Sequence, residues 1–291
     1  MQIQSSFHRD DTQGCLYLVP TPIGNLEDIT YRAVRMLSEV DLILAEDTRN
    51  SGHLLKHFEI STPMQSFHDF STDADIDKYI QRLQQGQTMA LISDAGMPLI
   101  NDPGHPLVTR AISENIAIIA LPGANAALTA LIASGLVSDR FTYLGFFPRK
   151  QQEQETLLKW IGLSRGTMIF YESPHRIAKT IDRMAEILPD TTRVVIAREL
   201  TKKFEEYLRG TIKEIQLYLT ESTPKGEMVL LIEAGSLIEI QQEELTVEAM
   251  KQLVDEWIER EGVTPMKAIK AVAKQYQLKK QEVYDAYHEL T

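Results

Sequence analysis

Cysteine is nearly absent from this sequence, because Cys15 is the only one among 291 residues. A single thiol excludes an internal disulfide and a zinc site built on several thiolates. Because Cys15 directly precedes an apolar segment, we interpret it as a small core residue rather than a nucleophile.

Long apolar runs are missing as well. No apolar segment reaches the roughly 20 residues that a membrane helix needs, and the first 14 residues are polar, without the core of a signal peptide. We therefore expect no membrane partner, a cytoplasmic location by default, and a flexible tail over residues 1–14.

The sequence also has no excess of positive charge. Its 30 Lys and Arg against 41 Asp and Glu give a formal net charge of −11. This balance disfavours nonspecific nucleic-acid binding over the whole surface, although it leaves room for a local basic patch. None of the glycine-containing loops described below fits G-x-G-x-x-G or G-x-x-x-x-G-K-[ST], so we expect no ordinary dinucleotide or nucleoside-triphosphate site.

Three apolar segments each run into a loop with proline and glycine and then into a helical pattern. These segments are residues 16–30, 91–104 and 116–125. Their glycines, among them Gly96 and Gly123, let backbone approach a ligand. Ligands of open α/β sheets bind beyond the carboxyl ends of strands, which favours one shared ligand site. Asp102 is expected to be the N-cap of a helix with Pro103 as its first residue. The alternative to a ligand site is a set of well-capped connections without a ligand.

The organisation along the chain predicts two α/β domains and a helical module. Residues 15–138 alternate between strand and helix patterns, which indicates a mostly parallel sheet covered by helices. Strands follow one another more closely over residues 139–236, which indicates a second α/β domain with a mixed sheet. Residues 237–247 are polar and are interpreted as a linker. Residues 248–291 have helical periodicity, and because their acidic and basic residues balance in number, we favour packing or docking over DNA binding.

The predicted elements have approximate bounds. In the first domain, strands are expected near 16–20, 41–46, 88–93 and 116–121, and helices near 30–39, 51–58, 75–85, 103–114 and 124–134. In the second, strands are expected near 141–147, 167–172, 192–199, 206–212 and 227–233, and helices near 152–161, 175–187 and 213–220.

Charged residues gather where one predicted strand of the first domain ends. Glu46, Asp47 and Arg49 are able to orient a hydroxyl, pair with a phosphate or accept a proton. The alternative is an N-cap and a salt bridge that stabilise the following helix.

Two further groups of residues could carry chemistry. Lys202 and Lys203 lie between two predicted strands and suit phosphate contact, with a solvated turn as the alternative. His53 and His57 lie four residues apart on a predicted helix, but no third ligand accompanies them, so we expect no metal site.

Taken together, seven segments resemble the bacterial small-subunit ribosomal RNA ribose 2′-O-methyltransferases of the tetrapyrrole-methylase-like superfamily. The segments are residues 19–30, 45–49, 93–104, 121–123, 170–172, 198–202 and 225–229. They occur in the family's order over residues 15–235, and the helical tail is similar to the family's C-terminal module. Met97 departs from the usual Thr, and Ala124 and Asn125 follow the Pro-Gly pair where Pro-Cys or Pro-Ser is common.

The resemblance implies a fold, a methyl donor and a substrate. The fold is two α/β domains of tetrapyrrole methylase type with a ligand cleft between them, followed by the helical module. The donor is S-adenosylmethionine, the protein is a homodimer, and the acceptor is a cytidine ribose in the decoding region of 16S rRNA in the assembled small subunit. Transfer from a sulfonium requires an aligned ribose hydroxyl and no metal.

The resemblance and the loop positions together give the expected site residues. Donor-binding residues are Pro20, Ser93, Asp94, Ala95, Gly96, Pro122, Gly123, Phe170, Tyr171, Leu200, Lys225, Gly226 and Glu227. Candidate catalytic residues are Glu46, Asp47, Arg49 and Lys202, among which the general base is left open. A larger side chain at Gly96 or Gly123 is expected to weaken donor binding and to leave the fold largely intact.

Two other functions fit parts of this pattern. A methylase of a tetrapyrrole or diphthine-type substrate would share the fold and the donor, although the segment 46–49 and the helical tail favour the rRNA group. A non-enzymatic regulator would use the α/β region as a ligand sensor and the helix-turn-helix spacing of the tail to read DNA. Methyl incorporation into small subunits, free rRNA and DNA distinguishes these functions.

Overall fold

The computed structural model describes residues 1–4, 14–68, 71–222, 224–237, 246–276 and 278–289. Contacts divide the chain into two compact units, which are described separately. Unit 1 comprises Met1–Ala133, Ala197–Glu206 and Glu227–Val229, and unit 2 comprises Ser134–Ile196, Tyr207–Gly226 and Leu230–Thr291. In this division the first long segment of unit 1 ends at Ala133, and two segments distant in sequence group with the same unit. The predicted domain bounds, 15–138 and 139–236, stay predictions.

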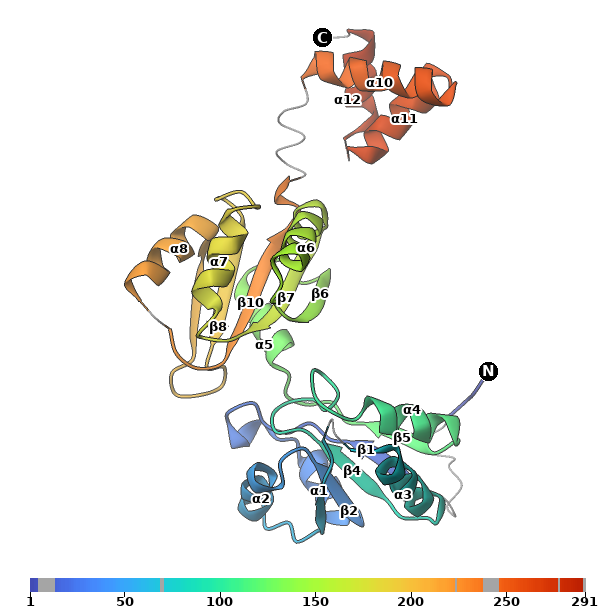
Figure 1. Ribbon diagram of the computed structural model, residues 1–291, viewed down its shortest axis with the longest axis vertical. Helices are drawn as coiled ribbons and strands as arrows, with labels where there is room; N and C mark the ends of the chain where they lie inside the picture. The colour runs from blue at the N-terminus through green and yellow to red at the C-terminus, as the bar shows by residue number, and fades with distance from the viewer. Residues whose placement is uncertain (5–13, 69–70, 223, 238–245, 277, 290–291) are drawn as a thin grey trace. The chain divides into compact units, whose positions relative to one another are not determined.

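Unit 1 is built on a five-stranded sheet with the order β3-β2-β4-β1-β5. Its elements are β1 (Cys15–Leu18), η1 (Leu26–Asp28), α1 (Tyr31–Glu39), β2 (Leu42–Ala45), α2 (Thr48–His57), β3 (Met64–Ser66), α3 (Asp73–Gln84), β4 (Met89–Ile92), α4 (His105–Ser113), β5 (Ala117–Ala120) and α5 (Ala126–Ser134). Every neighbouring pair is parallel. The predicted parallel sheet is confirmed (Figure 1). Strand β3 was not predicted, because three residues after Pro63 are too short to show periodicity.

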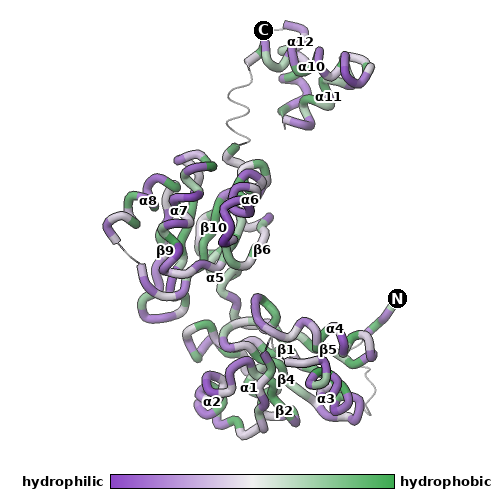
Figure 2. The backbone as a smooth tube through the Cα atoms, in the orientation of Figure 1, coloured by the Kyte–Doolittle hydropathy of each residue, from purple (hydrophilic) through white to green (hydrophobic). Residues whose placement is uncertain are grey.

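Both faces of this sheet are buried, which explains why its central strands are continuously apolar. Side chains alternate between the faces, so Cys15 and Leu16 of β1 belong to two different buried clusters. Figure 2 shows the apolar strands β2 and β4 in the hydrophobic colour. Cys15 is completely buried, in agreement with its interpretation as a core residue.

Helix starts agree with the sequence at some positions and differ at two. Thr30 caps α1, as its spacing predicts, by accepting a hydrogen bond from the amide of Ala33. Helix α2 begins at Thr48, because the Asp47 side chain caps it. The predicted cap at Asp102 is wrong. Helix α4 begins at His105 after Gly104, whose φ of +133° lets the chain turn into the helix.

Unit 2 contains a second five-stranded sheet with the order β6-β7-β10-β8-β9. Its elements are β6 (Phe141–Phe146), α6 (Gln151–Leu163), β7 (Gly166–Glu172), α7 (Ile177–Ala185), β8 (Arg193–Arg198), β9 (Glu206–Thr211), α8 (Ile212–Glu221) and β10 (Met228–Ala234). Strands β6 and β7 are parallel, whereas the short connection between the paired strands β8 and β9 indicates an antiparallel pair. The mixed sheet agrees with the sequence prediction.

The helical module comprises α10 (Val247–Glu261), α11 (Pro265–Gln275) and α12 (Lys280–His288), close to the three predicted helices. The helices pack on one another around an apolar core of their own: Met250, Val254, Ala268, Ile269, Val272, Ala273, Val283 and Ala286. Gly262 ends α10 in the left-handed conformation that favours glycine. Most of the predicted linker, residues 238–245, lies outside the described residues.

The predicted tail is partly described. Residues 5–13 lie outside the described residues, but Gln2 and Gln4 make specific contacts. The side-chain carboxamide of Gln4 pairs with the backbone of Ile118 much as a neighbouring strand would. Its Nε2 donates to the Ile118 carbonyl at 2.8 Å, and its Oε1 accepts from the Ile118 N–H at 2.9 Å. Residues 1–4 are therefore not a free tail. Among the helices that the structure describes, none has the length and apolar character required to cross a membrane.

Candidate functional site

The three proline- and glycine-containing loops share one edge of the first sheet. They follow β4, β1 and β5, which are adjacent and parallel. The end of β2 reaches the same edge, because Ala45 pairs with Ile92 at the end of β4. The prediction that these loops lie together is confirmed, and this edge is where an open α/β sheet places its ligand.

The loops after β1 and β4 are joined directly by backbone hydrogen bonds. Thr21 donates to the carbonyl of Gly96 at 2.9 Å, and Gly96 donates back at 3.0 Å. The Thr21 hydroxyl also donates to the carbonyl of Ser93 at 3.1 Å, and the Ser93 hydroxyl donates to that of Gly96 at 3.3 Å. Both hydroxyl side chains are buried. These hydrogen bonds therefore fix the loop at Thr21 and the loop at Ser93–Gly96 firmly to each other.

Two positions at this edge of the sheet favour glycine, each for a different physical reason. Gly96 has φ of +82°, which side chains rarely adopt. A Cβ on Gly123 would lie 2.6 Å from the Cβ of Pro20, closer than real Cβ contacts. A larger residue at either position would therefore force a local shift or backbone strain. The expectation that the fold stays largely intact remains a prediction.

The loop from β4 to α4 also contains strained residues that are not glycine. Leu99 and Asn101 have φ of +71° and +66°. Such conformations cost about 1–3 kcal/mol each and occur preferentially at ligand sites. The strain supports a binding role for this loop without identifying a ligand.

The residues after β2 form a tight network at the start of α2. Asp47 accepts hydrogen bonds from the Arg49 amide and guanidinium, with a shortest distance of 2.8 Å. The Asp94 carboxylate accepts from the Asp47 amide at 3.2 Å and from the Asn50 side chain at 2.9 Å. The cap and salt bridge that were the structural alternative for this segment are thus present.

Electrostatics distinguishes the members of this network. The hydrogen bonds from the Arg49 side chain and amide lower the pKa of Asp47 from 3.8 to about 2. Asp47 therefore remains a weakly basic carboxylate at neutral pH. The Arg49 side chain is 88% exposed and is already paired with Asp47. The catalytic roles of Glu46, Asp47 and Arg49 stay predictions.

Lys202 lies in the turn after β8, a segment that groups with unit 1. Its side chain lies beside the joined loops after β1 and β4. Its ammonium donates to Glu199 at 3.0 Å and to Glu227 at 2.9 Å. Burial lowers the pKa of Lys202, but its hydrogen bonds to Glu227 and Glu199 outweigh that effect and raise the pKa above its ordinary value. The aliphatic part of the Lys202 side chain packs against Gly24, and a Cβ on Gly24 would lie 2.5 Å from Lys202 Cγ.

A hollow of about 350 Å³ lies between these elements of unit 1. Its walls come from the loop after β1, the first turns of α2, the loop after β4 and the two segments that join unit 1 from far along the chain. The lining residues are Thr21, Pro22, Ile23, Gly24, Leu26, Asn50, Ser51, His53, Leu54, Ser93, Asp94, Ala95, Lys202 and Glu227.

One buried side chain that lines the hollow makes no hydrogen bond within the described residues. Ser51 is only 4% exposed, and its hydroxyl has no hydrogen-bond partner among the described residues. Beside Gly24, the Thr201 hydroxyl is likewise buried and unpartnered. Buried polar atoms without partners are costly. The hollow is therefore suited to a ligand that offers hydrogen bonds.

The hollow contains some of the predicted site residues and several that the sequence did not single out. Ser93, Asp94, Ala95, Lys202 and Glu227 were predicted, and all of them line it. Pro20, Gly96, Pro122 and Gly123 belong to the adjoining loops, and Leu200 is buried in the turn before Lys202. The lining residues from α2, Asn50, Ser51, His53 and Leu54, directly follow the charged segment Glu46–Arg49. That segment was the signal in the sequence that could have located them.

The remaining predicted donor-binding residues lie in unit 2. Phe170 is completely buried, with its ring 5.5 Å from that of Phe147, so its side chain is part of the core. Tyr171 packs edge-on to Tyr143. Lys225 and Gly226 precede β10, and Gly226 has φ of +90°. Their donor-binding roles stay predictions. No cluster of three or more His, Cys, Asp or Glu able to hold a metal occurs in the described ranges.

Comparisons with known proteins define the class first. The family model described as Tetrapyrrole (Corrin/Porphyrin) Methylases matches residues 15–216. Among solved structures, uroporphyrin-III-C-methyltransferase from Thermus thermophilus is 19% identical, with a TM-score of 0.54 over 80% of this chain and 100% of that chain. A diphthine synthase is 13% identical, with a TM-score of 0.60 over 78% and 95%. The chain belongs to the tetrapyrrole methylase family and has its fold.

Curated relatives narrow the family further. Ribosomal RNA small subunit methyltransferase I of Streptococcus pyogenes serotype M1 is 49% identical over 100% of both chains. The protein of that name from Bacillus subtilis (strain 168) is 45% identical over 98% of both. Within the tetrapyrrole methylases, the chain belongs to the ribosomal RNA small subunit methyltransferase I family, which confirms the resemblance seen in the sequence.

Proposed function

We propose that this chain transfers a methyl group from S-adenosylmethionine to the ribose 2′-oxygen of a cytidine in the decoding region of 16S rRNA, on the assembled small subunit. The supporting observation is the 49% sequence identity to a protein named ribosomal RNA small subunit methyltransferase I over the full length of both chains. It includes the site loops and the helical module together. A reaction on ribosomal subunits takes place in the cytoplasm.

The residues at the sheet edge fit the proposed donor. S-adenosylmethionine has an apolar adenosine body, hydrogen-bonding groups and a cationic sulfonium, so it suits a site of backbone groups and small residues with few charges. In unit 1, the residues that would hold it are Pro20, Ser93–Gly96, Pro122–Gly123, Leu200 and Glu227; in unit 2, they are Phe170–Tyr171 and Lys225–Gly226. The unpartnered hydroxyl of Ser51 is available to a bound ligand in the same region. When bound, the donor supplies a methyl group on an activated sulfonium leaving group.

The side chains of the acceptor segment then have distinct proposed roles. Asp47 is a poor proton acceptor, because Arg49 holds its pKa near 2, so we assign it to the positioning of α2. Glu46 is our candidate to orient the ribose hydroxyl and receive its proton, a contribution of about 10²–10⁴-fold for a general base. Arg49 is assigned to an adjacent phosphate through its exposed guanidinium.

Lys202 has a proposed role that differs from a simple phosphate clamp. Its ammonium remains protonated and is held by two carboxylates. We assign it to fix the position of Glu227 and the turn at Leu200 beside the donor loops. A secondary contact with the acceptor phosphate is compatible with this role, because the ammonium lines the hollow.

The test is methyl transfer with defined acceptors. Purified full-length protein with labelled donor is incubated with small subunits that lack the modification, with naked 16S rRNA, with DNA and with a tetrapyrrole precursor. We expect label in the small subunits, recovered after digestion as 2′-O-methylcytidine. Label on a base, on a tetrapyrrole or on none of the acceptors would contradict the proposal. Glu46→Gln with normal single-turnover rates would remove Glu46 from the mechanism.

We also propose that the protein is a homodimer. Strand β6 is an edge strand of the second sheet, and it exposes the large apolar side chains of Phe141 (43%) and Phe146 (55%). Exposed apolar groups along a sheet edge favour a protein partner. A second copy of the chain is the partner that the resemblance implies.

A further inference from the structure

Charges in the helical module are segregated, although they balance in number. Between residues 262 and 281 the chain has five lysines, Lys267, Lys270, Lys274, Lys279 and Lys280, and no Asp or Glu. The protein as a whole has a net charge of −11. Helix α11 and the start of α12 therefore form a local concentration of positive charge.

Helix geometry places three of these lysines on one face. Lys267, Lys270 and Lys274 have the spacing i, i+3, i+7, which brings side chains to the same side of a helix. The buried residues of α11, which include Ile269 and Val272, lie on the opposite side. All five lysines are exposed. With a rise of about 1.5 Å per residue, the row on α11 is roughly 10 Å long.

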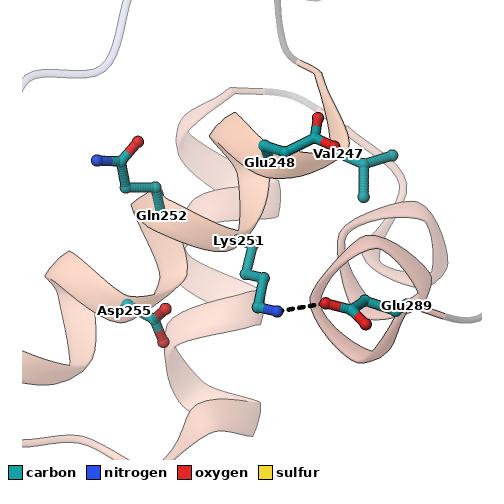
Figure 3. Close-up of a pocket in the computed structure, with 6 residues that line it drawn as sticks. All are labelled: Val247, Glu248, Lys251, Gln252, Asp255 and Glu289. Carbon is teal, nitrogen blue, oxygen red and sulfur yellow. Dashed lines mark hydrogen bonds and ion pairs between the residues drawn. The ribbon is translucent and has the colours of Figure 1, made fainter.

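Within the part of the chain that the structure describes, these lysines differ from Lys251 and Arg260 of the module in having no acidic partner. Among the described residues, none of the five forms an ion pair, whereas Lys251 pairs with Glu289 and Arg260 with Glu261. Figure 3 shows Lys251 pointing to Glu289 across a shallow hollow that also contains Glu248 and Asp255. Most of the acidic groups thus lie on α10 and at the end of α12, while Glu282, in the first turn of α12, is the acidic residue next to Lys279 and Lys280 in the sequence.

We propose that the basic face, defined as the five lysines of α11 and the start of α12, binds the phosphate backbone of small-subunit RNA. This inference rests on the proposed function. Exposed, unpaired ammonium groups release counterions when they meet phosphates, which gives binding without base specificity. Because the protein is acidic overall, a local basic face would orient it on RNA. The module anchors the enzyme, and the loops of the α/β units carry the reaction.

The test compares two triple variants of the full chain with equal charge change. The first is Lys267→Gln with Lys270→Gln and Lys274→Gln. The matched control is Lys56→Gln with Lys78→Gln and Lys179→Gln, three exposed helix lysines of the α/β units that form no ion pair among the described residues. Glutamine is a good helix former, so circular dichroism should show the same helix content in both.

Affinity for naked 16S rRNA is measured at several salt concentrations. Each lost phosphate contact lowers the slope of log K against log salt by about 0.7–0.9. For the first variant we expect a slope reduced by about 2 and affinity lower by roughly 10- to 100-fold near 0.1 M salt. The control should differ little from the unmodified protein. Methylation of subunits should show a higher KM and an unchanged kcat.

The outcomes separate this inference from the function on which it rests. If the unmodified protein methylates small subunits and the first variant has the control's slope and affinity, the basic face does not bind RNA. If the first variant loses affinity for whole subunits but not for naked rRNA, a ribosomal protein is the partner and the inference is wrong. If the unmodified protein neither binds rRNA nor methylates subunits, the proposed function itself fails.

Discussion

The close approach of Gly123 to Pro20 allows the role of these loops in donor binding to be tested by adding one methyl group, in Gly123→Ala. In Gly123→Ala the new Cβ would lie 2.6 Å from Pro20 Cβ and 2.9 Å from its Cγ, whereas ordinary contacts begin near 3.4 Å. One loop must therefore move by about 0.8 Å, the difference between 3.4 and 2.6. Pro20 resists this movement, because Thr21 is hydrogen-bonded to Gly96 and the amide of Val19 to Leu91. The loop at Gly123 is expected to move.

The size of the effect follows from overpacking. An added methyl group in a close-packed contact costs about 1–3 kcal/mol. We expect that loss in the free energy of unfolding, measured by urea denaturation. If the loop holds the donor, the displacement should also weaken donor binding at least tenfold, about 1.4 kcal/mol, measured by calorimetry. Methylation should fall by about 10- to 100-fold, since catalysis is sensitive to shifts of this size.

Gly52→Ala provides the matched control. A Cβ on this helical glycine meets only the Met64 side chain, at 3.9 Å, so the methyl group fits. Alanine in a helix is favoured over glycine by about 0.8–1 kcal/mol, and the control should be more stable with unchanged donor affinity. If Gly123→Ala has the stability and donor affinity of the unmodified protein, the contact does not constrain the site and the reasoning is refuted.

Three further predictions concern the cap, the edge strand and the helical module. Asp47→Asn should lower the free energy of unfolding by its full amount above pH 3.8, and this decrease should vanish as the pH falls toward and through 2, because folding depresses the pKa of Asp47 from 3.8 to about 2. Urea denaturation of both proteins at pH 7 and near pH 2 measures the difference. An equally large decrease at both pH values would contradict the assignment. Phe146→Arg should convert a dimer to a monomer in sedimentation experiments, because the exposed ring lies on an edge strand; an unchanged mass would exclude this edge. A chain ending at Gly235 should keep its donor affinity but methylate small subunits more slowly, and normal methylation would make the module dispensable.

Local signals were enough to predict much of the fold. Thr30 was correctly located at the start of a helix because the capping interaction involves residues three positions apart. The three loops were recognised because apolar strands run directly into prolines and glycines. Asp102 was misassigned because it has the composition of a cap, while Gly104 supplies the backbone conformation that the helix start requires. Sequence composition does not report φ.

The candidate site was predictable in its loops but not in its assembly. Glu227 was assigned to the donor site, but its ion pair with Lys202 joins residues 25 positions apart and has no signature in local spacing. Ser51 could not be singled out, because an unpartnered hydroxyl is defined by everything that surrounds it. The basic face was hidden by a nearly equal count of acidic and basic residues in the module, since a count does not record which helix face carries each charge.

The sequence by itself determined the alternation of strands and helices, the loops after β1, β4 and β5, the three helices of the module and, through its motifs, the family. Periodicity, capping and turn chemistry act over a few residues, so they can be read along the chain. Only the tertiary structure decided that β4, β1 and β5 are neighbours, that Pro20 excludes a side chain at Gly123, and that Lys202 joins the first unit. These depend on which strands pair and how side chains pack, and both are settled by burial of the whole chain rather than by any local segment.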